Sequence, residues 1–96
     1  MLFRSEMGEG LGCFSLGVIY ELGKGVKQDD VEAVKWFRTA CEKGYGRGCS
    51  GLGVMYELGK GVRQSNYEAL TYYGKACDMK DQLGCEGYAQ LKTGKR

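Results

Sequence analysis

Apolar and small residues recur along the chain at helical spacing. Residues 10–22 show the i, i+3, i+4, i+7 pattern of one helix face. The positions are Cys13, Leu16, Gly17 and Tyr20. Followed along the chain, the pattern predicts five helices, at residues 10–22, 30–43, 48–58, 66–79 and 83–93. Because the segments between them are short, we expect neighbouring helices to run antiparallel.

Start and stop signals agree with these helices. Asp29 is expected to cap the second one, with Glu32 reaching back to complete a capping box. Ser65 and Glu68 repeat this arrangement before the fourth. The chain has 17 glycines and no proline, so we expect glycine to end the helices, as at Gly44.

The predicted helices belong to a repeat with a period of 36 residues. Cys13, Cys49 and Cys85 form one series at this spacing, and Cys41 and Cys77 form another. A fixed period of this size is typical of stacked repeat proteins. We therefore predict an all-α fold, an α/α solenoid of antiparallel helix pairs with about two and a half repeats.

The whole chain, residues 1–96, is expected to form a single domain. Its predicted parts are a remnant of a preceding repeat at 1–9, a first repeat at 10–43, a second repeat at 44–80 and a C-terminal capping helix at 81–96. The last helix is more polar than its counterparts, as the exposed end of an array requires.

Composition and charge exclude several classes of protein. A net charge of +2 is too small to indicate a nucleic-acid or membrane-surface partner. No apolar run approaches the roughly 20 residues that a membrane helix needs. The first residues lack the apolar stretch of a signal peptide. Histidine is absent, which excludes Ser-His-Asp triads and Cys/His zinc fingers.

Four of the five cysteines stand in pairs around glycine-rich turns. Cys41 and Cys49 flank seven residues, and Cys77 and Cys85 do the same one period later. A tight turn between antiparallel helices can bring two Cα atoms within the roughly 4.4–6.8 Å that a disulfide requires. We predict the bridges Cys41–Cys49 and Cys77–Cys85, one per repeat, and a free thiol at Cys13.

Reduced core cysteines and a metal site are the competing interpretations. Four sulfurs around one zinc would have to lie within about 4 Å of each other, whereas stacked helix pairs lie roughly 10 Å apart. No Cys-x-x-Cys occurs, so a thioredoxin-type site has little support. Cys13 is expected to be unpaired because Ser5 stands where its partner belongs. We expect no metal and no cofactor.

The repeated motif resembles a known family. It combines Leu-Gly-x-x-Tyr, at Leu16–Tyr20 and Leu52–Tyr56, with an Ala-Cys pair that ends the second helix and a seven-residue gap to the next cysteine. This is similar to the Sel-one-like repeat, a relative of the tetratricopeptide repeat, and to its cysteine-rich Helicobacter branch. The resemblance implies a solenoid with one disulfide per repeat, secreted or exported to the periplasm.

The resemblance also implies two functions. Sel-one-like repeats act as scaffolds that bind protein or peptide ligands. The cysteine-rich branch is associated with penicillin binding and weak β-lactam hydrolysis. A β-lactamase that takes a β-lactam or cell-wall-like small molecule is therefore the alternative. Binding is expected where the copies differ, and in related solenoids the first helix of each pair lines the concave surface, so we expect the groove positions on the first helices. They are Phe14, Glu21, Ser50 and Glu57.

Catalytic motifs receive little support from the sequence. No serine has a lysine three residues on, and Lys92-Thr93-Gly94 spells a β-lactamase motif without its companions. We therefore assign no catalytic residue. Residues 46–51 spell G-x-G-x-x-G, but a helix precedes them, so an interhelical turn is expected rather than a nucleotide site. The aromatic side chains of the second helices are expected to pack in the core and on the convex side. They are Trp36, Phe37, Tyr72 and Tyr73.

Overall fold

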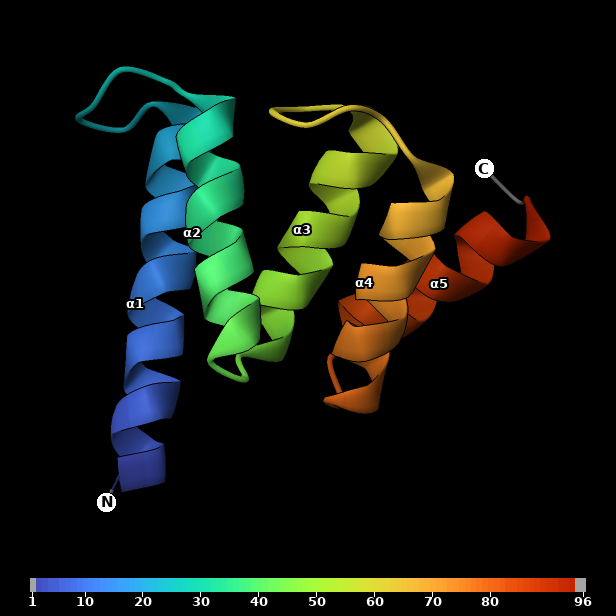
Figure 1. Ribbon diagram of the computed structural model, residues 1–96, viewed down its shortest axis with the longest axis horizontal. Coiled ribbons are helices and arrows are strands. Elements are labelled where there is room, and N and C mark those ends of the chain that lie inside the picture. The colour runs from blue at the N-terminus through green and yellow to red at the C-terminus, as the bar shows by residue number, and fades with distance from the viewer. Residues whose placement is uncertain (1, 95–96) are drawn as a thin grey trace.

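The structure is a computed structural model that describes residues 2–94, with side chains from residue 8 onward. Its elements are α1 (Leu2–Leu22), α2 (Asp30–Glu42), α3 (Gly46–Leu58), α4 (Asn66–Asp78) and α5 (Gln82–Thr93). Within this part of the chain no strand occurs. The helices stand side by side in chain order, with the two termini at opposite ends of the row (Figure 1). The predicted all-α solenoid is confirmed.

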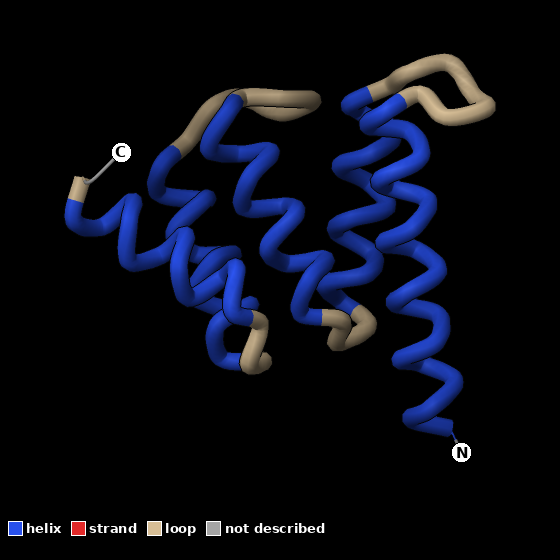
Figure 2. Tube along the Cα trace, turned by 180° about the vertical axis from the view of Figure 1, so that it is seen from behind, coloured by secondary structure: helices blue, strands red, loops and turns tan. Residues whose placement is uncertain are grey.

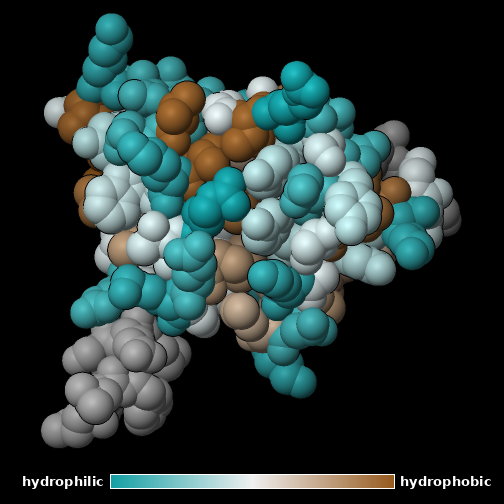
Figure 3. Space-filling view, in the orientation of Figure 1, coloured by the Kyte–Doolittle hydropathy of each residue, from teal (hydrophilic) through white to brown (hydrophobic). Residues whose placement is uncertain are grey.

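The connecting turns alternate between the two ends of the helices, so consecutive helices are antiparallel (Figure 2). Helices α1, α3 and α5 are the first helices of their pairs, and α2 and α4 are the second helices. Helix α3 lies between α2 and α4 and contacts both. Figure 3 shows one broad face, on which apolar residues are exposed in small groups among hydrophilic ones.

The N-terminal helix differs from the prediction. We expected a helix to begin near residue 10, after a remnant of another repeat, but α1 runs unbroken from Leu2. One period later the chain turns at Gly44, whose φ is +85°, whereas Gly8 is not in the left-handed region. The turn at Gly44 is held between two disulfide-bonded cysteines. Because Ser5 replaces the first cysteine of such a pair, no bridge holds a turn near residue 8, and the helix continues with its hydrogen bonds intact.

The core is formed where aromatic rings of the second helices lie against glycines of the first helices. Phe37 is 2% exposed and Tyr73 is 3% exposed, as predicted. A Cβ atom on Gly17 would lie 2.6 Å from the Phe37 ring, and one on Gly53 would lie 2.8 Å from the Tyr73 ring. These glycines therefore allow the close approach of helices that offsets their low helix propensity.

The predicted inner face of α1 is covered less than that of α3. Leu16 is 37% exposed, although its counterpart Leu52 is fully buried. Leu52 packs in one cluster with Ala33, Val34, Phe37 and Met55. Helix α3 has a second helix on each side, whereas α1 packs mainly against α2. Leu16 is therefore less covered than Leu52, because no further helix of the described chain packs on its outer side.

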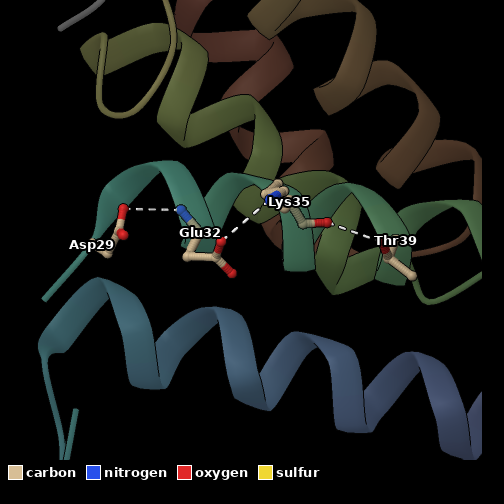
Figure 4. A network of polar contacts seen from close by, with 4 residues as sticks. All are labelled: Asp29, Glu32, Lys35 and Thr39. Atoms are coloured by element: carbon tan, nitrogen blue, oxygen red, sulfur yellow. Dashed lines mark hydrogen bonds and ion pairs between the residues drawn. The ribbon is translucent and has the colours of Figure 1, made fainter. Parts of the chain in front are cut away.

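The second helices begin with side-chain caps. The backbone N–H of Glu32 donates to Asp29 Oδ1 at 3.1 Å, and that of Glu68 donates to Ser65 Oγ at 3.1 Å. The second hydrogen bond of the predicted capping box, from the backbone N–H of Asp29 to the Glu32 carboxylate, does not form in α2. The Glu32 carboxylate pairs with Lys35 instead (Figure 4). The N–H of Asp29 donates to the carbonyl of Tyr20 at 2.9 Å, so it needs no bond from Glu32.

Replacing Ser65 by alanine is expected to lower the free energy of unfolding by about 1 kcal/mol, because a backbone N–H of the first turn loses its acceptor. Urea denaturation followed by circular dichroism measures the change. Thr71→Ala is the control, since this exposed hydroxyl donates only within α4, to the Tyr67 carbonyl. A loss in Ser65→Ala no larger than in the control would contradict the capping role.

Candidate functional site

Two disulfides join consecutive helices across their short connecting turns. Cys41 and Cys49 join α2 to α3 with a Cα–Cα distance of 4.6 Å, and Cys77 and Cys85 join α4 to α5 at 4.5 Å. Cys13 is a free, half-buried thiol. Both predicted bridges are confirmed. Bridged sulfurs do not ligate metal, and no group of three metal-ligating side chains was found among the described residues.

The four predicted groove residues all make contacts within the chain. The Phe14 ring lies 5.5 Å from the rings of Phe37 and Tyr45, measured between centroids. The Glu21 carboxylate is 3.1 Å from the Lys60 ammonium. Contacts of the remaining two, Ser50 and Glu57, also cross between helices. These are Ser50 Oγ donating to Asp81 Oδ2 and Tyr73 Oη donating to Glu57 Oε1 at 2.7 Å.

Of these four residues, Ser50 lines a recess that the other three do not line, and their shared role in one binding groove stays a prediction. Phe14 packs at the edge of the core. Ser50 lies at the N-terminal end of α3, whereas Glu21 and Glu57 lie near the C-terminal ends of α1 and α3. The recess that Ser50 lines lies between α3 and α5. We call this recess the α3–α5 groove. Its lining residues are Arg47, Ser50, Gly51, Val54, Tyr73, Leu83, Glu86, Gly87 and Gln90.

The α3–α5 groove has an apolar interior and a polar rim. Its volume is about 220 Å³. Val54 and Leu83 form exposed apolar walls, with Leu83 49% exposed. The floor includes Gly87, where a Cβ atom would lie 2.7 Å from the Tyr73 ring. This volume is below the roughly 300–1,000 Å³ of small-molecule sites, so the groove suits one side chain of a larger partner.

The groove is open because one pair of residues changes between the copies. In the first copy the rings of Phe14 and Tyr45 pack together. One period later the same positions hold Ser50 and Asp81, which are joined by a hydrogen bond. The Arg47 Nε donates to Asp81 Oδ1 at 2.9 Å and completes this polar group. Two smaller side chains thus replace two rings and leave space between α3 and α5.

Sequence reasoning found Ser50 but missed Asp81 and Arg47. The signal was present in the period, because Asp81 stands where the first copy has Tyr45. A paired change from two aromatic to two polar residues indicates contact between the positions. The G-x-G-x-x-G run at residues 46–51 forms the first turns of α3, so the expectation that it lies in an interhelical turn is wrong.

Chemically, the polar group of the groove is suited to holding helices together. Ser50 is 2% exposed, and its hydroxyl already donates to a carboxylate. A buried oxygen of this kind is not positioned to attack a substrate, which must approach to about 3 Å. None of the helices in the described residues has the length and apolar character needed to cross a membrane.

Comparisons with known proteins agree with the repeat. A family model described as the Sel1 repeat matches residues 10–45 and again residues 46–81. None of the curated proteins compared with the sequence matches it. Among solved structures, Helicobacter pylori cysteine rich protein B is similar, with a TM-score of 0.77 and 36% sequence identity over 80% of this chain and 58% of that one.

Two further solved structures are similar. A Sel1 repeat protein from Oxalobacter formigenes has a TM-score of 0.83 and 27% identity, over 85% of this chain and 34% of that one. A protective antigen of uropathogenic Escherichia coli with an SLR fold has a TM-score of 0.76 and 34% identity, over 85% of this chain and 18% of that one. The chain thus spans less than two thirds of each of these proteins. Because two adjacent matches cover residues 10–81, the chain belongs to the Sel1 repeat family.

Proposed function

We propose that this chain is a disulfide-stapled scaffold that binds a protein or peptide segment in the α3–α5 groove. The observation that supports it best is the open recess between two first helices, with apolar walls at Val54 and Leu83. A peptide side chain that enters this recess would bury apolar surface, while Glu86 and Gln90 at the rim offer polar partners. Binding sites with an apolar centre and a polar rim are usual for protein partners.

The disulfides support an extracytoplasmic location. Such bonds form and persist in oxidising compartments, and two of them in a chain of 96 residues are typical of exported proteins. We therefore propose that the protein is secreted or periplasmic. The small size of the core fits this proposal, because short domains depend on covalent staples for stability.

β-Lactam hydrolysis, the alternative implied by the family resemblance, has no comparable support. The groove hydroxyl of Ser50 is buried and engaged with Asp81, as described above. Neither Lys92 nor Thr93 lines the groove. We therefore propose binding rather than hydrolysis, and a peptide or protein rather than a β-lactam as the ligand.

Replacing Leu83 by arginine is expected to weaken peptide binding at least about tenfold, because a charged chain fills the apolar part of the groove. The probe is a displayed library of random twelve-residue peptides, selected on the native protein and then measured on the variant by surface plasmon resonance. Val31→Arg is the matched control, since Val31 is an exposed valine on α2, outside the groove.

Two results would contradict this assignment. The first is that no peptide is enriched on the native protein. The second is that enriched peptides bind Leu83→Arg as tightly as they bind the control. Circular dichroism confirms that both variants keep their helices, as expected for substitutions at side chains that are 49% and 58% exposed.

A further inference from the structure

An arginine ties together three helices near the middle of the chain. From α2, Arg38 donates through Nη2 to the Tyr56 hydroxyl at 3.0 Å and through Nη1 to the Tyr72 hydroxyl at 3.2 Å. The two tyrosine rings are stacked, with centroids 5.7 Å apart and planes 6° apart. The guanidinium carbon also lies 6.0 Å from the centroid of the Tyr56 ring. The cation is therefore held in one place before any ligand arrives.

The hydrogen-bond partners of Arg38 are neutral hydroxyl groups. No carboxylate lies within 4.0 Å of the guanidinium among the described residues. The hydrogen bond to Tyr56 raises the pKa of Arg38 above its ordinary value, against the opposing effect of burial. A guanidinium has five N–H donors, and the two tyrosines account for two of them. The remaining N–H groups can donate to a carboxylate in a bidentate pair.

A recess of about 250 Å³ opens next to this arginine, between the second helices α2 and α4. We call it the α2–α4 recess. Its lining residues are Arg38, Cys41, Glu42, Tyr72, Lys75, Asp78 and Met79. Cys41, Tyr72 and Met79 supply apolar surface. The Lys75 ammonium is a second cation, 5.6 Å from the centroid of the Tyr72 ring, and no carboxylate of the described residues lies within 4.0 Å of it.

We propose that the α2–α4 recess binds a glutamate side chain of a protein partner. Its carboxylate would pair with Arg38 and Lys75, and its methylene groups would lie on Met79 and Tyr72. The volume suits a single side chain rather than a whole small molecule. This site lies on the second helices and does not depend on the α3–α5 groove.

Two acidic residues of the recess narrow the choice of ligand. Glu42 and Asp78 are exposed at its rim, so the lining carries two positive and two negative side chains. Their charge disfavours phosphate and other multiply charged anions. It favours a single carboxylate with a lysine or arginine next to it in the partner. The recess thus fits a segment in which glutamate alternates with a basic residue.

The two repeats differ at the position of Arg38. One period after Arg38 the chain has Gly74, which supplies no cation. The corresponding recess, lined by Gly74, Cys77, Asp78 and Tyr88, therefore lacks the guanidinium. The Arg38 side chain is specific to the interface between the two repeats, so the site occurs once in the described chain.

The test uses two pools of fluorescent eight-residue peptides that are identical except for a central glutamate or glutamine, each flanked by one lysine. Fluorescence anisotropy with the native protein is expected to show about tenfold tighter binding of the glutamate pool, the factor that charge-assisted hydrogen bonds provide. Arg38→Gln is expected to remove this preference, and Lys75→Gln is expected to reduce it about threefold. Arg63→Gln is the matched control, because Arg63 is exposed and lies outside the recess.

Each outcome supports or overturns the proposal. Equal binding of the two pools to the native protein overturns it, as does a glutamate preference that survives in Arg38→Gln. An equal loss in Arg38→Gln and Arg63→Gln also overturns it, because it would show general attraction to positive charge. If Arg38→Gln melts below the assay temperature, Lys75→Gln decides, since that exposed side chain can be changed without breaking the hydrogen bonds of Arg38 to Tyr56 and Tyr72. Leu83→Arg is expected to keep the preference, which separates this site from the groove.

Discussion

Replacing Phe37 by alanine is expected to lower the free energy of unfolding by about 3–5 kcal/mol, the usual cost of truncating a buried phenylalanine. Phe37 is 2% exposed and its ring lies 5.5 Å from that of Phe14. The ring fills the space above Gly17 and Gly51, which have no side chains to move into the cavity. Because small domains have total stabilities of about 5–15 kcal/mol, the variant is expected to be close to unfolding at 25 °C.

Chemical denaturation with urea, followed at 222 nm, measures this loss. Val31→Ala on the same helix is the control, since Val31 is 58% exposed and its truncation is expected to change stability by less than about 0.5 kcal/mol. A loss below about 1 kcal/mol for Phe37→Ala would mean that neighbouring side chains close the cavity. The glycine contacts would then not be rigid, contrary to our account of the core.

Removing the disulfide between Cys41 and Cys49 by a double alanine substitution is expected to cost about 2.6 kcal/mol, the chain-entropy value for a nine-residue loop. In a domain of this size the melting temperature would fall by roughly 10–20 °C. The bridge joins α2 to α3 in the middle of the row, where Cys49 is fully buried. Differential scanning calorimetry measures the change.

The second bridge and the free thiol provide the controls for this experiment. Cys77 and Cys85 close a loop of the same length but are half-buried, so their removal is expected to cost less than that of the first pair. Cys13→Ala is expected to leave the melting temperature within a few degrees of the native value, because no bond is lost. If all three variants had the melting temperature of the native protein, the bridges would not stabilise the fold.

Much of the fold could be predicted from local signals. The positions of Cys41 and Cys49 on either side of a glycine turn were sufficient to predict their bridge. The cap at Ser65 was predicted in the same way. These features depend on residues close together in the chain, so spacing alone describes them.

The groove was harder to predict, because it depends on which side chains meet across helices. Phe14 was selected as a ligand contact, which stays a prediction, and the sequence did not indicate that its ring packs on Phe37 and Tyr45. The role of Ser50 as a binding residue stays a prediction, although the residue does line the groove. Asp81 was not considered, because its contact with Ser50 is indicated only when both positions are compared with Phe14 and Tyr45 one period earlier.

By itself the sequence determined the period, which is visible as identical residues 36 positions apart, and also the helix pairs and the pairing of the cysteines, which rest on residues a few positions apart. Only the tertiary structure decided which faces are covered and where recesses open. Leu16 and Leu52 occupy the same place in the repeat, yet one is 37% exposed and the other is buried. The difference arises from the number of neighbouring helices. Arg38 likewise becomes a candidate ligand site only because stacking brings Tyr56 and Tyr72 within reach of its guanidinium.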